Sequence, residues 1–154
     1  MNIKDLLKKP DLEEKSRELK QFVQFDKLIR ELKARTLPEH TIKTINLEVD
    51  AINSTLELGK KLAKQIKTSL AKIIKLLEKD LKIVTKNYYR NLWLAIGVGA
   101  FGVPLGVALG SILGNMAFIG IGMPIGMAIG VAIGTQMDKK AATEGRQLDL
   151  EVQY

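Results

Sequence analysis

The sequence predicts an all-α fold: a membrane helical hairpin with glycine-zipper packing, preceded by an N-terminal helical coiled-coil stalk. Three observations carry this prediction. Every charged residue lies in residues 1–90 or 138–154, so the 47 residues of 91–137 carry no charge. Because about 20 apolar residues suffice to cross a bilayer, this stretch is long enough for two crossings. Apolar residues recur at helical spacing before it, and glycines recur every four residues within it.

Residues 1–36 predict an amphipathic helix. The capping residue Asp11 is followed by acidic residues in the first turn. Apolar residues then recur at spacings of three and four from Leu19 to Leu32, so we expect a helix over 11–35. The first nine residues lack the continuous apolar run of a secretory signal, so insertion into a membrane would depend on the internal apolar stretch.

Residues 37–90 predict one long basic helix with a heptad seam. Apolar residues alternate at spacings of three and four from Ile42 to Val84, with interruptions at Gly59 and Asp80. A single helix of this length would be a rod of about 80 Å. Two explanations of the seam stay open. It packs within this chain, with the first helix folding back along the first half of the rod, or it packs between copies.

The second half of this region is strongly basic. Residues 58–90 contain ten bases and two acids, a net charge of +8. A solvated helix face, a surface for anionic lipid headgroups and a nucleic-acid surface are the three interpretations. Each base near an anionic membrane contributes about 1 kcal/mol. Nucleic acid is the least favoured partner, because the only aromatic residues here are Tyr88 and Tyr89, beside the apolar stretch.

The residues that flank the apolar stretch are typical of a membrane interface, where aromatic rings and long bases gather. We expect the following residues there: Lys82, Lys86, Tyr88, Tyr89, Arg90, Trp93, Lys139 and Lys140. Bases on the outer sides of two crossings predict that both termini are cytoplasmic. Residues 138–154 then form a polar C-terminal tail that begins as a helix extension.

Residues 91–137 contain a tandem repeat. Residues 102–110 align with 122–130 without a gap, and Gly, Pro, Gly, Ala and Gly coincide. We therefore expect two helices, over 91–113 and 117–137, joined by a tight turn.

A β-hairpin is the competing interpretation, because small and large residues also alternate with the period of a strand. Each segment is about twice as long as a β-crossing requires. Pro104 and Pro124 would also interrupt a strand ladder. In helices, the same prolines leave a kink or a re-entrant segment open.

Each expected helix carries a glycine at every fourth position, which would let two backbones approach closely in lipid. The two rows are Gly102, Gly106, Gly110 and Gly114, and Gly122, Gly126, Gly130 and Gly134. A second row of small residues lies on the opposite face: Ala100, Pro104 and Ala108, and Gly120, Pro124, Ala128 and Ala132. One row would meet the hairpin mate and the other a second copy, so we expect a homo-oligomer. The alternative is that small residues are simply frequent in membrane helices.

The repeated glycine run encloses Asn115 and leads through Met137-Asp138-Lys139-Lys140 to Glu144-Gly145-Arg146-Gln147-Leu148. With these features residues 97–148, about a third of the chain, resemble small bacterial glycine-zipper two-helix membrane proteins. The resemblance implies a membrane hairpin of unknown activity. We expect this hairpin in the bacterial inner (cell) membrane. Glycine-zipper segments elsewhere are associated with oligomers and pores.

The composition excludes several kinds of chemistry. The chain has no cysteine and one histidine, which excludes disulfides and a cysteine nucleophile and disfavours zinc and haem sites. The glycines of 97–102 match a dinucleotide motif, but no strand precedes them and no acidic residue follows at about 20 residues. We therefore expect no enzyme activity, no cofactor and no metal.

Three functional hypotheses remain. The first is an oligomeric membrane protein that forms a pore or perturbs the bilayer through glycine-packed helices. The second is a non-conducting membrane anchor that presents a cytoplasmic coiled coil to a partner protein. The third is a soluble chain whose glycine segment is buried in a partner or assembles into β-structure.

Overall fold

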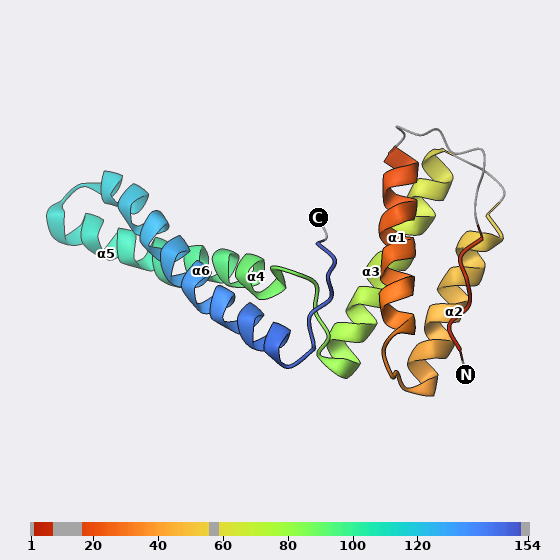
Figure 1. The fold of residues 1–154 in the computed structure, drawn as a ribbon. Helices are drawn as coiled ribbons and strands as arrows, with labels where there is room; N and C mark the ends of the chain where they lie inside the picture. The colour runs from red at the N-terminus through yellow and green to blue at the C-terminus, as the bar shows by residue number, and fades with distance from the viewer. Residues whose placement is uncertain (1, 8–16, 56–58, 152–154) are drawn as a thin grey trace. The chain divides into compact units, whose positions relative to one another are not determined.

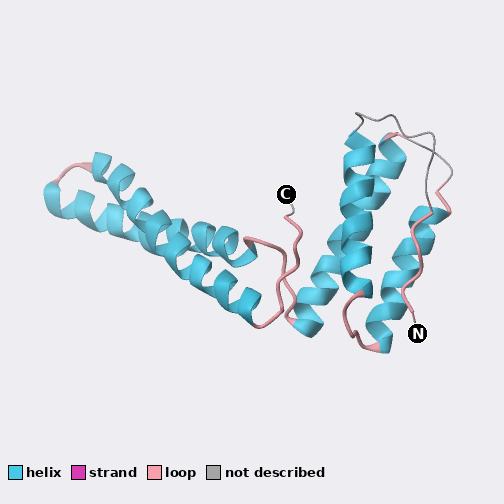
Figure 2. Ribbon diagram, viewed as in Figure 1, coloured by secondary structure: helices cyan, strands magenta, loops and turns pink. Residues whose placement is uncertain are grey.

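The computed structural model describes residues 2–7, 17–55 and 59–151, and every regular element within them is a helix (Figure 1, Figure 2). The all-α class is therefore confirmed. The chain divides into two compact units, which we describe separately. The first contains Met1–Val84 and Leu148–Val152, and the second contains Thr85–Gln147.

The first unit is built from α1 (Arg17–Lys33), α2 (Glu39–Asn53) and α3 (Lys60–Leu81). Helix α3 packs against both α1 and α2, whereas α1 and α2 make no close backbone contact within the described residues. Each of the three helices buries apolar residues in a shared core, and each fully buried Leu or Ile stabilises the unit by about 1.5–3 kcal/mol. The core includes Phe25, Leu28, Leu32, Ile45, Val49, Ile52, Leu62, Ile66, Ile73 and Leu77.

The single rod expected over 37–90 is wrong. Helix α2 ends at Asn53 and α3 begins at Lys60, after Gly59 with a φ of +76°. Lys82 then ends α3 with a φ of 54°. These backbone conformations lie outside the right-handed helical region, so the helix is interrupted twice.

The heptad seam packs within this chain, because most of its described apolar residues lie in or against the core of the first unit. The expected partner of the first helix is wrong, however. Helix α1 packs against α3, the second half of the seam, and not against α2. The helix expected over 11–35 is described from Arg17 to Lys33, and its predicted cap at Asp11 lies outside the described residues.

Polar side chains join α2 to α3 along this interface. The Glu48 carboxylate accepts hydrogen bonds from the Ser69 hydroxyl at 2.6 Å and from Lys72 Nζ at 3.0 Å. Asp80, the second interruption of the seam, lies 3.4 Å from His40, measured from Oδ2 to Nε2. The seam therefore tolerates Asp80 because its carboxylate reaches a polar partner on the neighbouring helix.

The second unit is a helical hairpin. Its first segment runs through α4 (Tyr88–Ile96), the π-helix η1 (Gly97–Gly102) and α5 (Val103–Leu113). Its second runs through the short 3₁₀ helix η2 (Met116–Phe118) and α6 (Ile119–Thr143).

Both segments of the hairpin are long and apolar enough to cross a membrane. The helical reading is confirmed over the β-hairpin. Helical structure continues through Pro124, which lies inside α6, and Pro104 lies in the first turn of α5, directly after the π-helix. The turn is as tight as predicted, with Gly114 at a φ of 67° and Asn115 Oδ1 accepting a hydrogen bond from Ala117 N at 2.9 Å.

The polar tail expected over 138–154 is only partly correct. The predicted helix extension is present, because α6 continues to Thr143. Leu148 and Leu150, however, are 1% and 3% exposed and belong to the core of the first unit. Leu148 N also donates a hydrogen bond to Val84 O at 2.8 Å. Leu148 and Leu150 therefore contribute to the packing of the first unit.

Candidate functional site

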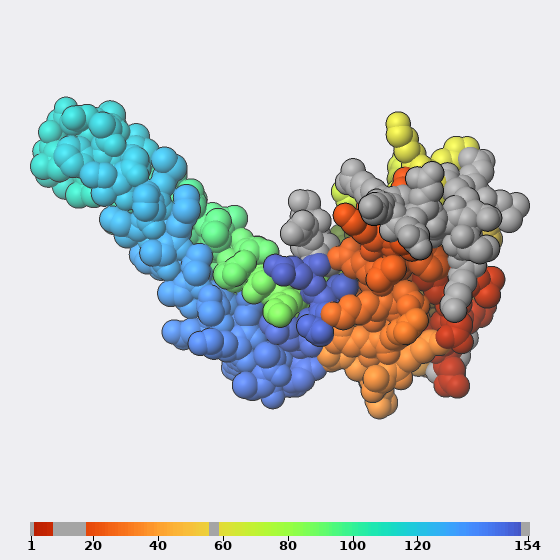
Figure 3. Space-filling model, turned by 45° about the horizontal axis from the view of Figure 1, so that its top comes forward, coloured from red at the N-terminus to blue at the C-terminus, as the bar shows by residue number. Residues whose placement is uncertain are grey.

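The two helical segments of the second unit touch through their backbones. A Cβ added to Gly122 would lie 2.5 Å from the Gly106 nitrogen, and one added to Gly126 would lie 2.5 Å from the Gly102 nitrogen. Real Cβ atoms essentially never come this close to another heavy atom. The glycines therefore leave no room for any larger side chain, and in Figure 3 the blue atoms of α6 lie directly against the green atoms of α4.

The close approach extends along the hairpin. A Cβ on Gly134 would lie 2.5 Å from the Arg90 Cα, and one on Gly130 would lie 2.8 Å from the Trp93 carbonyl carbon. Near the turn, a Cβ on Gly106 would lie 2.6 Å from the Ile119 Cα. Both glycine rows thus face the opposite segment of the same chain.

The two rows do not contribute uniformly. A Cβ on Gly110 would lie 3.2 Å from the Asn115 carbonyl oxygen, a tight but looser approach than the others. Gly114 faces open space, and its φ of 67° makes it a turn residue. Its place in the packing row is therefore wrong, because the chain has already left helical geometry there.

Gly97 also lies on the face of the first segment that contacts α6, although the sequence did not predict it there. A Cβ on Gly97 would lie 2.9 Å from the Gly130 Cα. Gly97 precedes Gly102 by five residues, which would rotate it off the row in an α-helix. The π-helix between the two glycines accommodates the extra residue, since its hydrogen bonds span five residues instead of four. The glycine contact therefore continues toward the start of α4.

Asp138 was also missed, since it was assigned only to the tail. Its Oδ1 accepts a hydrogen bond from Tyr89 N at 3.0 Å, and its Oδ2 accepts one from Arg90 N at 2.9 Å. Asn87, the residue before α4, makes no side-chain cap hydrogen bond. A carboxylate on α6 thus satisfies the unpaired N–H groups at the start of α4 and complements its helix dipole.

The outer surface of the hairpin is apolar. Only 17% of the residues in each apolar window are buried, and these are mainly glycines. Large apolar side chains point outward instead, among them Phe101, Leu105, Ile112, Ile121, Met123, Ile125 and Met127. The second row of small residues, from Ala100 to Ala108 and from Gly120 to Ala132, is exposed as well. This arrangement is the reverse of a water-soluble helix pair, which buries its large apolar residues.

Comparison of the chain with protein-family models, with curated proteins and with solved structures gives no match.

The residues expected at a membrane interface gather at one end of the hairpin, which we call the open end: the start of α4 and the end of α6. The Asp138 hydrogen bonds hold these two helix ends together. Tyr88, Tyr89, Arg90 and Trp93 are partly buried there, and Lys86, Lys139 and Lys140 are exposed. The rings of Tyr88 and Tyr89 pack edge to face, with their centroids 5.2 Å apart. Lys82 belongs to the first unit, where it ends α3.

Arg146 is a further base, just beyond the end of α6. Gly145, with a φ of 69°, ends the helix, and Arg146 N donates a hydrogen bond to Ala141 O at 2.8 Å. The hydrogen bond of its guanidinium to the Glu144 carboxylate raises the pKa of Arg146 above its ordinary value.

Within the part of the chain that the structure describes, no group of His, Asp or Glu residues is arranged to hold a metal ion.

Proposed function

We propose that this chain is an integral membrane protein whose hairpin of α4 to α6 crosses the bilayer twice and anchors the helical first unit at the membrane surface. The observation that carries the proposal is the reversed packing of the hairpin, with glycines inside and large apolar side chains outside. Exposure of this surface to water would cost about 25 cal/mol for each Å² of apolar area. Exposure to lipid carries no such cost.

The charge distribution along the hairpin supports an orientation. The open end carries Lys86, Arg90, Lys139 and Lys140, whereas the turn from Gly114 to Phe118 has no charged residue. Bases near the ends of membrane helices favour the cytoplasmic side and attract anionic headgroups. We propose the bacterial inner membrane, with both termini cytoplasmic and the turn on the far side.

Two features favour an anchor over a pore. Apart from Gly114, the residues of both glycine rows already contact the opposite segment of the same chain, so they are not free to join copies. The uncharged stretch also offers few polar side chains to line a water-filled passage: Asn91, Ser111, Asn115, Thr135 and Gln136. The first unit, with its own core, would then present a surface to a cytoplasmic protein partner.

A pore-forming or bilayer-perturbing homo-oligomer is the second candidate. The exposed second row of small residues favours it, because Ala108, Gly120, Ala128 and Ala132 would let the backbone of another copy approach. The oligomer interface would then lie on this row instead of on the two glycine rows.

Cysteine labelling tests the membrane hairpin, since the chain has no cysteine of its own. We expect Asn115→Cys in intact cells to react with a membrane-impermeant maleimide. The matched variant Lys140→Cys should react only after lysis. Protein that remains in the supernatant after ultracentrifugation without detergent, as a monomer, would overturn the proposal.

Dye release from liposomes separates the anchor from the pore. An anchor predicts no release at any protein-to-lipid ratio, with insertion verified in the same vesicles by Asn115→Cys labelling. Release that rises steeply with protein concentration and disappears in Ala128→Leu would establish the oligomeric pore instead.

A further inference from the structure

Residues 2–7, which we call the strap, lie along α2 in the first unit (Figure 1). The side-chain amide of Asn46 holds the beginning of the strap. Its Oδ1 accepts a hydrogen bond from Lys4 N at 2.8 Å, and its Nδ2 donates one to Asn2 O at 3.1 Å. One side chain of α2 therefore pairs with a donor and an acceptor of the strap backbone.

Asn53 repeats this arrangement at the other end of the strap. Its Oδ1 accepts a hydrogen bond from Leu7 N at 2.9 Å, and its Nδ2 donates one to Asp5 O at 3.1 Å. The two asparagines are seven residues apart, about 10.5 Å along a helix. The paired strap positions are three residues apart, about 10 Å of extended chain. The spacing on α2 thus matches a non-helical peptide backbone.

Side chains add selectivity to these backbone contacts. Ile3 lies between the two residues held by Asn46 and is 8% exposed, within the core of the first unit. Lys4 Nζ lies 2.6 Å from Asp50 Oδ2 on α2. Asp5 forms a second ion pair, with Lys33 on α1, in which the strap supplies the acid and the helix supplies the base. The groove between α1 and α2 therefore suits an apolar residue followed by a base and an acid.

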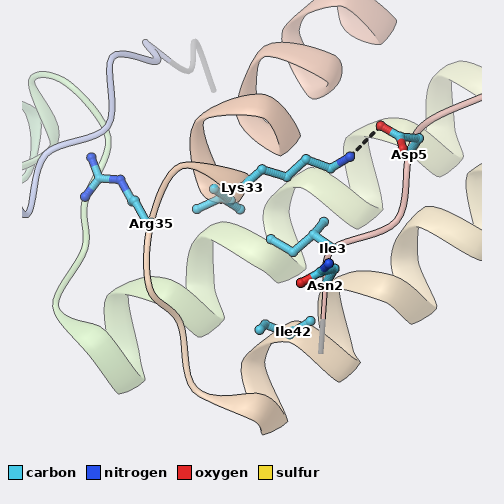
Figure 4. Close-up of a pocket in the computed structure, with 7 residues that line it drawn as sticks. Asn2, Ile3, Asp5, Lys33, Arg35 and Ile42 are labelled. Atoms are coloured by element: carbon cyan, nitrogen blue, oxygen red, sulfur yellow. Dashed lines mark hydrogen bonds and ion pairs between the residues drawn. The ribbon is translucent and has the colours of Figure 1, made fainter.

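Most of the strap is nevertheless exposed, since only Ile3 is buried and Leu6 is partly buried. Both side chains of the Lys4–Asp50 pair are about half exposed, and exposed pairs contribute about 0–1 kcal/mol. A cleft of about 440 Å³ lies beside the strap, and its lining includes Asn2, Leu32 and Arg35. Figure 4 shows Ile3 and Ile42 among the side chains that line it. The strap thus leaves part of its groove unfilled. Segments with few buried contacts open locally at low free-energy cost.

We propose that the groove between α1 and α2 also accepts the strap of a second copy of this chain, so that neighbouring first units exchange straps. A second copy carries the same apolar residue, the same charge pair and the same backbone spacing, so the exchanged form keeps each of these contacts. Exchange of an identical element is a low-cost route to association. The proposal rests on the proposed membrane anchor for one point only, the high effective concentration of copies on a shared membrane.

Cross-linking between differently tagged copies of the full chain tests the exchange. We would reconstitute Lys4→Cys with one tag and Asp50→Cys with another into the same liposomes and add a short bis-maleimide. The expected product is a dimer that carries both tags. The matched control pairs Lys4→Cys with Leu47→Cys, since Leu47 is 62% exposed on the same helix, and this pair should give at least tenfold less product.

A mixed-tag dimer that is lost when Asn46→Ala and Asn53→Ala are added to the Asp50→Cys copy would show that the exchanged strap is held by these two asparagines. The double variant Lys4→Cys/Asp50→Cys shows whether the strap closes within one chain. A link within chains but none between copies would overturn the exchange. Asn115→Cys labelling of the same vesicles separates this failure from a failure of the membrane anchor.

Discussion

Asp138 on α6 accepts a hydrogen bond from the backbone N–H of Arg90 at 2.9 Å, so one helix of the hairpin caps the start of the other. The bond joins residues 48 positions apart in sequence. Because Asp138 is only 7% exposed, it is partly shielded from competing water. The hairpin is thus joined by a polar clamp at its open end and by glycine contacts along its length.

Removal of this cap should destabilise the hairpin. We expect Asp138→Ala to lower its free energy of unfolding by about 1 kcal/mol, the usual contribution of an N-cap. Asp138→Asn should lose less, because an amide oxygen still accepts a hydrogen bond. Trp93, the only tryptophan, lies against Gly130 and reports unfolding by its fluorescence in detergent. Lys139→Ala, at an exposed neighbour, is the control, and equal stability of all variants would contradict the cap.

Two glycines of α6 should respond oppositely to alanine. Gly126 lies against the α4–η1–α5 segment, whereas a Cβ on Gly120 would meet nothing within 4 Å. Gly126→Ala should force the helices apart and lower the Trp93 unfolding midpoint. Gly120→Ala should raise it, since alanine favours a helix by about 1 kcal/mol over glycine. If Gly126→Ala were as stable as Gly120→Ala, the close backbone contact would be wrong.

Deletion of one residue from the π-helix should be tolerated. Removal of Gly99, which faces open space, places Gly97 and Gly102 four positions apart and permits an ordinary α-helix. The glycine contacts then keep their alignment, so we expect unchanged or higher stability by Trp93 fluorescence. Deletion of Ala128 in α6 is the matched comparison. It should rotate one half of the glycine row by about 100° and disrupt the contact. Equal effects of the two deletions would rule out this role of the π-helix.

The end of the chain should stabilise the first unit. Leu148 is 1% exposed in its core, so Leu148→Ala should cost about 2–5 kcal/mol. Leu47→Ala, at a residue that is 62% exposed, should cost little. Hydrogen exchange of α1 and α3 amides measures the difference. Protection that stays the same in Leu148→Ala would show that the tail does not support the core.

The sequence by itself predicted the helical class, the two long apolar helices and the tight turn between them. These features follow from local periodicity and from properties of single residues: the four-residue glycine spacing marks one helix face, and Gly114 with Asn115 suits a tight turn. The heptad spacing of apolar residues likewise predicted a buried helix face, but it did not identify the helix that packs against this face.

Only the tertiary structure decided how distant segments meet. Asp138 was a tail residue until α6 brought it to α4, and Gly97 was out of register until a π-helix realigned it. Asn46 and Asn53 gained their role from the strap, and Leu148 from the core of the first unit. Periodicity is a property of neighbours along the chain, whereas each of these roles depends on a contact with a segment far away in sequence or on a local departure from ideal helix geometry.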